Sequence, residues 1–397
     1  MMRAALLSLI VCLPSLALAQ KPNPQVDSGP LASSAVQVVY VIDGSTLTTY
    51  DIDPQTLYAT QVGTLTLPES TYPNIVSSSN DRFLYYTAYS SPAQSSPQYL
   101  WVYATDASGA PQTPAVQKIN VTGLYGGPII DPQANFFYMV HAGRAGRQDT
   151  TFTIRRYLVD SNTGKISQPQ VEAQYELAND PSAQDCGLLL DGFNANGNKL
   201  YDQVSCSYPG GDKSLYNQRT INPQTGALGP DVEIYSWNNS SQGGESVQFV
   251  NNRMFDFVVP NGYQLGVNVV NIYQVQPNVT TPLVQCTASM LEACGYFNTP
   301  TLVHPSGKYL FLGISPGTTQ IEKVELGAKE IVDTSNYIPY AVEQFSPDGT
   351  IAYGNYYVGP GFFIEIYGFD VSTATVTPGG IIGAPSALDS WFTADRY

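Results

Sequence analysis

Short hydrophobic runs separated by polar turns recur along the whole chain. Each unit has a hydrophobic strand, a turn rich in Asn, Asp, Pro and Gly, and a second strand rich in Tyr and Phe. Such runs with turn punctuation are typical of β-strands joined by tight turns. Six internal copies begin at Asn74, Pro128, Gly187, Glu245, Pro300 and Tyr340. The turns recur about every 52 residues, a spacing that suits four-stranded propeller blades with long loops.

A third strand and a further hairpin follow in the repeats. They are visible in YLWVYATDASGAPQ, FTIRRYLVDSNTGKIS, LYNQRTINPQTGALG and IEIYGFDVSTATVTP. The turns DASG, SNTG and PQTG are polar and end in Gly, as a tight reversal requires. The strands IRRYLV and VVYVID alternate only loosely between apolar and polar residues, which predicts sheets buried on both faces. No long 3.6-residue periodicity is present, so a helical solenoid is disfavoured.

The two ends of the chain each carry part of a unit. The segment ALDSWFTADRY, from Ala387, supplies an inner strand and a turn, and AVQVVYVIDGSTLTTYDID, from Ala35, supplies a second and third strand without a first. Together they complete one blade, which would pair edges that are otherwise open. We therefore predict an all-β, seven-bladed β-propeller over residues 35–397, in which the last blade is closed by N- and C-terminal strands.

The N-terminus has the pattern of an export signal. Arg3 precedes the apolar run from Ala4 to Leu13, and the small residues Ala17 and Ala19 follow. This predicts a signal peptide over residues 1–19, cleaved after about Ala19, and a flexible segment over residues 20–34. The apolar core is too short to span a bilayer. We expect a secreted or periplasmic protein without a membrane span.

Charge and missing motifs exclude several function classes. The formal net charge is −15 and no run of Lys and Arg is present, which argues against nucleic-acid binding. The sequence contains no G-x-S-x-G, H-E-x-x-H or Walker motif, so we expect no cofactor and no metal. A cation held in the channel by Glu69, Asp185 and Glu245 is a less favoured possibility, because no calcium-loop motif is present. We expect a monomer.

The cysteines predict two disulfides. Besides Cys12 in the signal peptide, the chain has Cys186, Cys206, Cys286 and Cys294. An even number in an exported chain indicates disulfide pairs. Of the three pairings, 186–206 and 286–294 are favoured: the first pair is symmetric about the turn at residue 196, and the second encloses one short loop.

Two turns carry a family resemblance. The elements HPSGKY, from His304, and SPDGT, from Ser346, resemble the turns of the YVTN and lactonase-type seven-bladed propellers, which include 6-phosphogluconolactonases. Through its repeats the resemblance covers nearly the whole mature chain. It implies the propeller fold and, more weakly, a lactone-opening activity. The chain departs from the sugar-phosphate enzymes of this group in having no cluster of Arg and Lys that could grip a phosphate.

One face of the disc is predicted to carry the ligand site. The loops between second and third strands and those between blades emerge together on one side, which we call the loop face. Aromatic residues in or near these loops are suited to sugars, peptides or aromatic compounds. The predicted ligand-binding residues are Tyr72, Tyr89, Tyr125, Arg147, Tyr208, Trp237, Tyr263, Tyr296 and Tyr357. The alternative is that many of these rings pack between blades.

The candidate catalytic residues are His141, Arg144 and Glu245. A His acts as a general base and an Arg stabilises an oxyanion, and lactone opening needs both. Asp149 lies in the same segment, and Glu245 follows two glycines at the start of an inner strand. A structural role for His141 is the competing interpretation. His304, in a turn of the opposite face, is predicted to be structural.

Two functions follow from these residues. The favoured hypothesis is a secreted propeller that binds a small molecule, glycan or protein partner on its aromatic-rich loop face. The alternative is a lactonase-like hydrolase that uses the same face. Binding leads because recognition-type aromatics are abundant while the chain has only 2 His. The sequence therefore leaves enzymatic activity undecided.

Overall fold

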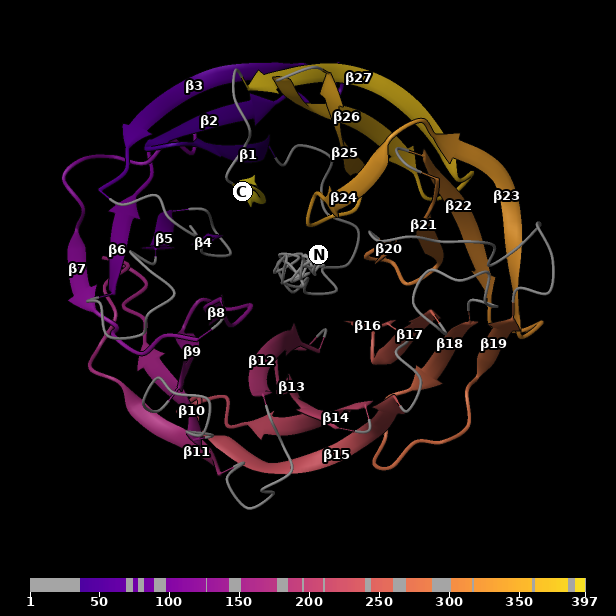
Figure 1. The fold of residues 1–397 in the computed structure, drawn as a ribbon. Coiled ribbons are helices and arrows are strands. Elements are labelled where there is room, and N and C mark those ends of the chain that lie inside the picture. The colour runs from indigo at the N-terminus through magenta and orange to yellow at the C-terminus, as the bar shows by residue number, and fades with distance from the viewer. Residues whose placement is uncertain are drawn as a thin grey trace, which may run out of the picture.

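The computed structural model describes most of the chain and places it in seven antiparallel sheets. The described residues are 36–68, 74–77, 82–88, 98–125, 127–142, 151–176, 185–194, 196–209, 211–239, 244–259, 269–287, 301–315, 318–358, 361–384 and 390–396. Every named element within them is a strand. Each of the 7 sheets has four strands, and the sheets are arranged around a central axis like the blades of a propeller (Figure 1). The predicted fold is confirmed.

The blades follow chain order, with the first strand innermost and the fourth at the rim (Figure 1). Blade 1 contains β4 (Asn74–Ser77), β5 (Phe83–Ala88), β6 (Tyr99–Ala104) and β7 (Gln117–Asn120). Blade 2 contains β8 (Ile129–Ile130), β9 (Phe136–Ala142), β10 (Thr151–Leu158) and β11 (Gln170–Glu176). Blade 3 contains β12 (Asp185–Phe193), β13 (Lys199–Tyr208), β14 (Gly211–Ile221) and β15 (Leu228–Asn239).

The second half of the ring repeats this order. Blade 4 contains β16 (Gly244–Val250), β17 (Arg253–Val259), β18 (Val269–Gln274) and β19 (Val284–Thr287). Blade 5 contains β20 (Thr301–Val303), β21 (Tyr309–Ser315), β22 (Thr318–Glu325) and β23 (Glu330–Ile338). Blade 6 contains β24 (Ala341–Phe345), β25 (Ile351–Val358), β26 (Gly361–Asp370) and β27 (Thr375–Ala384).

Blade 7 joins the two ends of the chain. Its strand order is β28 (Ser390–Arg396), β1 (Val36–Asp43), β2 (Thr46–Ile52) and β3 (Ala59–Thr66). The inner strand β28 pairs antiparallel with β1, with Trp391 opposite Val41 and Thr393 opposite Val39. The predicted closure by terminal strands is therefore confirmed, and the ring has no open blade.

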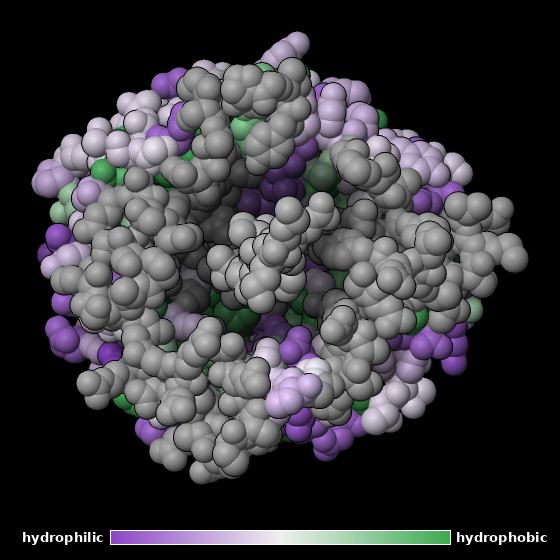
Figure 2. All heavy atoms as spheres, in the orientation of Figure 1, coloured by the Kyte–Doolittle hydropathy of each residue, from purple (hydrophilic) through white to green (hydrophobic). Residues whose placement is uncertain are grey.

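The core lies between the blades. Seven clusters of buried side chains fill the interfaces of neighbouring blades. In β5 all six residues are buried, because one set of side chains packs on blade 7 and the alternate set on blade 2. This burial of both faces explains the weak alternation in the sequence. Hydrophilic residues are prominent around the rim in Figure 2.

Tyrosines of the second strands tie each of three blades to the next. The phenolic hydroxyl donates to the carbonyl of a glycine in the neighbouring hairpin turn, at 2.7 to 3.0 Å. The pairs are Tyr40 with Gly109, Tyr85 with Gly164 and Tyr138 with Gly226. The glycines have positive φ angles, which side chains with a Cβ rarely adopt. The DASG, SNTG and PQTG turns thus fix contacts between blades.

His304 has a structural role. It occupies the turn position that holds Asp131 in blade 2 and Ser346 in blade 6, whose side chains accept backbone N–H groups. The His304 Nδ1 atom accepts the N–H of Ser306 at 3.0 Å, and Nε2 lies 2.9 Å from the Gly349 carbonyl of the next blade. The ring is buried, and burial lowers its pKa to about 4.

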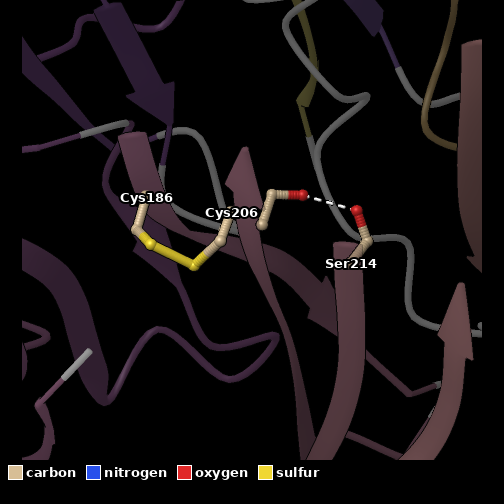
Figure 3. Close-up of a disulfide and its surroundings, with 4 residues drawn as sticks. Cys186, Cys206 and Ser214 are labelled. Atoms are coloured by element: carbon tan, nitrogen blue, oxygen red, sulfur yellow. Dashed lines mark hydrogen bonds between the residues drawn. A yellow bond between two sulfur atoms is a disulfide. The ribbon is translucent and has the colours of Figure 1, made fainter. Parts of the chain in front are cut away.

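One predicted disulfide is present in blade 3. Cys186 and Cys206 lie directly opposite each other in β12 and β13 and are joined by a disulfide (Figure 3). On β13 and β14 the hydroxyls of Ser205 and Ser214 are 2.6 Å apart (Figure 3). Cys286 is also disulfide-bonded. Cys294 lies outside the described residues, so its pairing stays a prediction.

Candidate functional site on the loop face

Many residues predicted for the site lie outside the described part of the chain. These are Tyr72, Tyr89, Arg144, Arg147, Asp149, Tyr263 and Tyr296. Glu245 and Tyr357 are described only as strand positions: Glu245 lies opposite Val258 in blade 4, and Tyr357 lies opposite Phe362 in blade 6. The side chains available for a description of the loop face are His141, Tyr125, Tyr208 and Trp237.

His141 is buried at the loop-face end of β9. It lies opposite Thr153 of β10 and forms a bridge with Leu124 on the other side. Only 2% of the residue is exposed. Its Nε2 atom is 3.2 Å from the hydroxyl of Tyr157. The segment before β8 thus covers the ring from the inner side of the blade.

Burial keeps the His141 ring neutral. Its pKa is lowered to about 4, mainly by desolvation and in addition by the positive charge of Arg155, while a hydrogen bond with the Thr122 backbone partly offsets both effects. Burial also raises the pKa of Tyr157 to about 12, although Arg155 works against this through its charge and a hydrogen bond. At neutral pH the pair is therefore uncharged beside a cationic guanidinium. It can orient a ligand by hydrogen bonds.

Tyr125 lies close to His141 in the same blade. Its backbone N–H donates to the Val140 carbonyl at 2.8 Å, and its ring contacts Phe152 edge-on with centroids 5.0 Å apart. Its hydroxyl reaches the first strand of blade 3, where a Cβ on Gly187 would come within 2.7 Å of it. The glycine therefore leaves the space that this hydroxyl needs, and Tyr125 spans from blade 2 to blade 3.

The other two aromatic residues stand on blade 3. Tyr208 ends β13 and packs, half-buried, against the cluster that also contains Cys206. Trp237 lies on the outer strand β15, opposite Ser214. The structure thus brings Tyr125 and His141 together and places Tyr208 near the disulfide at the blade 2 and blade 3 interface. Trp237 lies apart from them on the rim strand.

Three polar residues at the interface that holds His141 were not singled out from the sequence. Arg155 and Tyr157 belong to β10, and Thr87 belongs to β5 of the neighbouring blade. The sequence feature that could have drawn attention to Arg155 is the pair of consecutive arginines in IRRYLV. Arginine is rarely buried, so two arginines in a strand that is buried on both faces are unusual. Because neighbouring strand residues point to opposite faces, two arginines in sequence must enter two different interfaces.

No metal site is present in the part of the chain that the structure describes. No three His, Cys, Asp or Glu side chains there lie close enough to hold an ion. Nor does any helix among the described residues have the length and hydrophobicity needed to cross a bilayer.

Comparison with known proteins supports the fold alone. No protein-family model matches the sequence, and no curated protein matches it. The periplasmic gluconolactonase PpgL of Pseudomonas aeruginosa is similar in structure, with a TM-score of 0.56 and 10% identity over 91% of this chain and 99% of that one. A Lactobacillus plantarum protein has a TM-score of 0.52 and 10% identity over 88% and 100%. The class of protein is therefore a seven-bladed β-propeller, and at these identities the likeness extends no further.

Proposed function

We propose that this chain is an exported propeller that binds a small molecule, glycan or protein partner on its loop face, beside Tyr125 and Tyr208. The observation that carries the proposal is the contrast at the loop-face end of blade 2. Tyr125 is only half-buried there, where its ring packs between blades 2 and 3, while His141, the candidate base, is buried and hydrogen-bonded to Tyr157. Rings with polar tips on a rigid scaffold suit recognition.

Export is part of the proposal. The leader pattern of residues 1–19 predicts secretion, and the Cys186–Cys206 disulfide fits an oxidising compartment. The periplasmic location printed for the structural neighbour PpgL is consistent with this. Membership of the YVTN and lactonase-type group is likewise proposed on the turns HPSGKY and SPDGT together with the shared fold.

The binding proposal is tested by screening the purified mature protein against neutral glycans, sugar acids and lactones. Isothermal titration calorimetry should find at least one ligand, and Tyr208→Ala should weaken it at least tenfold. Tyr58→Ala is the matched control, because Tyr58 is an exposed tyrosine in the turn between β2 and β3, on the face opposite the loop face. Equal affinity of both variants and the wild type would place the ligand elsewhere and contradict the proposed site.

A second candidate function is lactone hydrolysis. The observation that favours it is the similarity to a gluconolactonase, which covers 91% of this chain and 99% of that one. His141, Arg144 and Glu245 are the proposed catalytic residues, with His141 as base. The assay is the opening of glucono-1,5-lactone above its spontaneous rate. His141→Gln should abolish it, and His304→Gln, a change at the other buried histidine, should not. Turnover that survives His141→Gln would reject this assignment.

A further inference from the structure

The interface of blades 1 and 2 contains a polar cluster below the loop face, formed by Thr87, His141, Arg155 and Tyr157. Tyr85 of β5 points toward blade 2, since its ring centroid is 4.9 Å from that of Phe137. Because side chains alternate along a strand, Thr87 points the same way. The hydroxyl of Thr87 therefore faces the layer that holds His141.

Blade 2 presents Arg155 to this same layer. Tyr157 packs on Phe137 with ring centroids 6.5 Å apart, so Tyr157 faces blade 1. Arg155, two residues earlier in β10 and opposite Met139, shares that face. Its effects on the pKa values of both His141 and Tyr157 show that the guanidinium lies close to them. The four side chains thus converge from two blades.

Polar atoms of this cluster lack partners within the described residues. The Oγ1 atom of Thr87, a residue that is 1% exposed, has no hydrogen-bond partner, and neither has the buried Nε atom of Arg155. Buried polar groups are nearly always satisfied, and an unsatisfied charged donor is especially costly. Two donors that face one layer without acceptors indicate a missing acceptor.

The neighbouring arginine shows what Arg155 lacks. Arg156 points to the opposite interface and forms an ion pair with Glu172 at 2.7 Å. Arg219 of blade 3 similarly pairs with Asp202 at 3.0 Å. No carboxylate among the described residues forms a salt bridge with Arg155. A water molecule would satisfy a hydrogen bond but would leave this positive charge without a counter-charge.

We propose that the Thr87, His141, Arg155 and Tyr157 cluster binds the carboxylate of a small, singly charged organic anion. A guanidinium matches the geometry of a carboxylate, and the Thr87 and Tyr157 hydroxyls supply further donors. The net charge of −15 repels anions in proportion to their charge, which favours a carboxylate over a phosphate. The inference rests on the proposed ligand-binding function and adds to it the chemical class of the ligand.

The test measures binding of sodium gluconate by calorimetry and by the shift in melting temperature. Glucose and sodium chloride, at the same concentration and ionic strength, are the neutral and inorganic controls. Gluconate should bind the wild type, and Arg155→Gln should weaken it at least tenfold. Arg253→Gln is the matched control, because Arg253 lies at the far end of β17, near Gly307 on the opposite face, and it should bind as the wild type does.

A second variant keeps the test decisive if Arg155→Gln folds poorly. Thr87→Val replaces the unpartnered hydroxyl by a methyl group of the same shape, so without ligand its melting temperature should be unchanged or higher. It should nevertheless weaken gluconate binding severalfold. A merely structural role for Thr87 would not weaken gluconate binding while leaving the melting temperature unchanged or higher.

The outcomes separate this inference from the proposed function. If gluconate shifts the melting temperature no more than sodium chloride does, or binds both variants as tightly as the wild type, the carboxylate site is rejected. Binding of a neutral glycan that depends on Tyr208 would then leave the proposed function standing alone. A response to phosphate that exceeds the response to gluconate would also reject the choice of carboxylate.

Discussion

Asp202 in blade 3 and Glu322 in blade 5 are both completely buried carboxylic acids, and their surroundings are opposite. Asp202 accepts hydrogen bonds from Asn217 and Arg219, each at 3.0 Å. Glu322 accepts one from Gln320 at 2.7 Å, its second oxygen has no partner, and its strand neighbour opposite is Leu310. Both carboxyl groups are thus equally buried, but Asp202 has a counter-charge beside it and Glu322 has none.

The difference determines the protonation of Glu322. Burial raises the pKa of its carboxyl to about 8, and the nearby Asp333 contributes in the same direction. At neutral pH Glu322 is therefore mostly a neutral acid, whereas Asp202 faces a permanent cation. The comparison teaches that the blades of this ring share a fold while using different chemistry to hold their interfaces.

The largest effect should come from breaking the buried ion pair. Asp202→Ala leaves Arg219 buried without its main partner, which should lower the free energy of unfolding by ~3–5 kcal/mol. The matched control is Asp231→Ala, since Asp231 also approaches Arg219, at 3.6 Å, but has a side chain that is 51% exposed. The control should cost ~1 kcal/mol or less. Urea unfolding measures both, and equal losses would contradict the comparison.

The disulfide is a second feature that sets blade 3 apart. It closes a loop with a sequence separation of 20 residues, so replacing Cys186 and Cys206 together by Ala should lower stability by about 3 kcal/mol. Thermal unfolding in the oxidised state measures this. Free thiols at both positions in the oxidised wild type would refute the pairing.

Glu322 should make stability depend on pH. Its folded-state pKa of about 8 exceeds the ordinary value of 4.5, so its contribution is complete below pH 4.5 and is lost as the pH rises through 8. Between about pH 6 and 7.5 the wild type should lose ~2 kcal/mol through this group. Glu322→Gln should remove this dependence. Urea unfolding of both proteins at the two pH values gives the comparison.

The histidines act in the other direction. Burial lowers the pKa values of His141 and His304 to about 4, so their contributions are complete above 6.5 and are lost as the pH falls toward 4. In the Glu322→Gln variant the loss of stability on acidification should therefore be more visible than in the wild type. The two histidines offset much of the Glu322 effect in the wild type between pH 6 and 7.5, so the decisive quantity is the difference between the two proteins: an identical pH dependence of the wild type and Glu322→Gln would contradict the neutral Glu322.

The smallest expected effect compares tyrosine hydroxyls of the two blades. Tyr309 of blade 5 donates to the Val371 carbonyl of blade 6 at 2.8 Å. The buried hydroxyl of Tyr201 in blade 3 has no hydrogen-bond partner among the described residues. Tyr309→Phe should cost ~1 kcal/mol, while Tyr201→Phe should be neutral or stabilising. A cost for Tyr201→Phe equal to that for Tyr309→Phe would show that its hydroxyl is satisfied.

The fold could be predicted from the sequence because its information is local and repeated. Turn residues, strand lengths and the half-units at Ala35 and Ala387 can be recognised without long-range contacts, and the spacing of Cys186 and Cys206 about their turn predicted their register. Each blade repeats the same local rules, so an error in one unit is corrected by the others.

The candidate site was harder to predict, since its contacts are set by other blades. Nothing near His141 in the sequence indicates that Leu124 would cover it or that Tyr157 would approach its ring. Arg155 and Arg156 are adjacent in the chain, yet only the packing of blades shows that the second one meets Glu172. Side-chain burial at an interface depends on both partners, and the pattern of one strand describes only one of them.

The pairing of β28 with β1 has a consequence for biogenesis. The inner strand of blade 7 comes from residues 390–396, so β1 keeps an unpaired hydrogen-bonding edge until the strands of the other six blades have been synthesised. The ring closes only when β28 pairs with β1, which we expect to follow formation of the other sheets. The hydrogen bonds between β28 and β1 therefore join the segments that are farthest apart in the described sequence, so this sheet is the one whose completion depends on all the others.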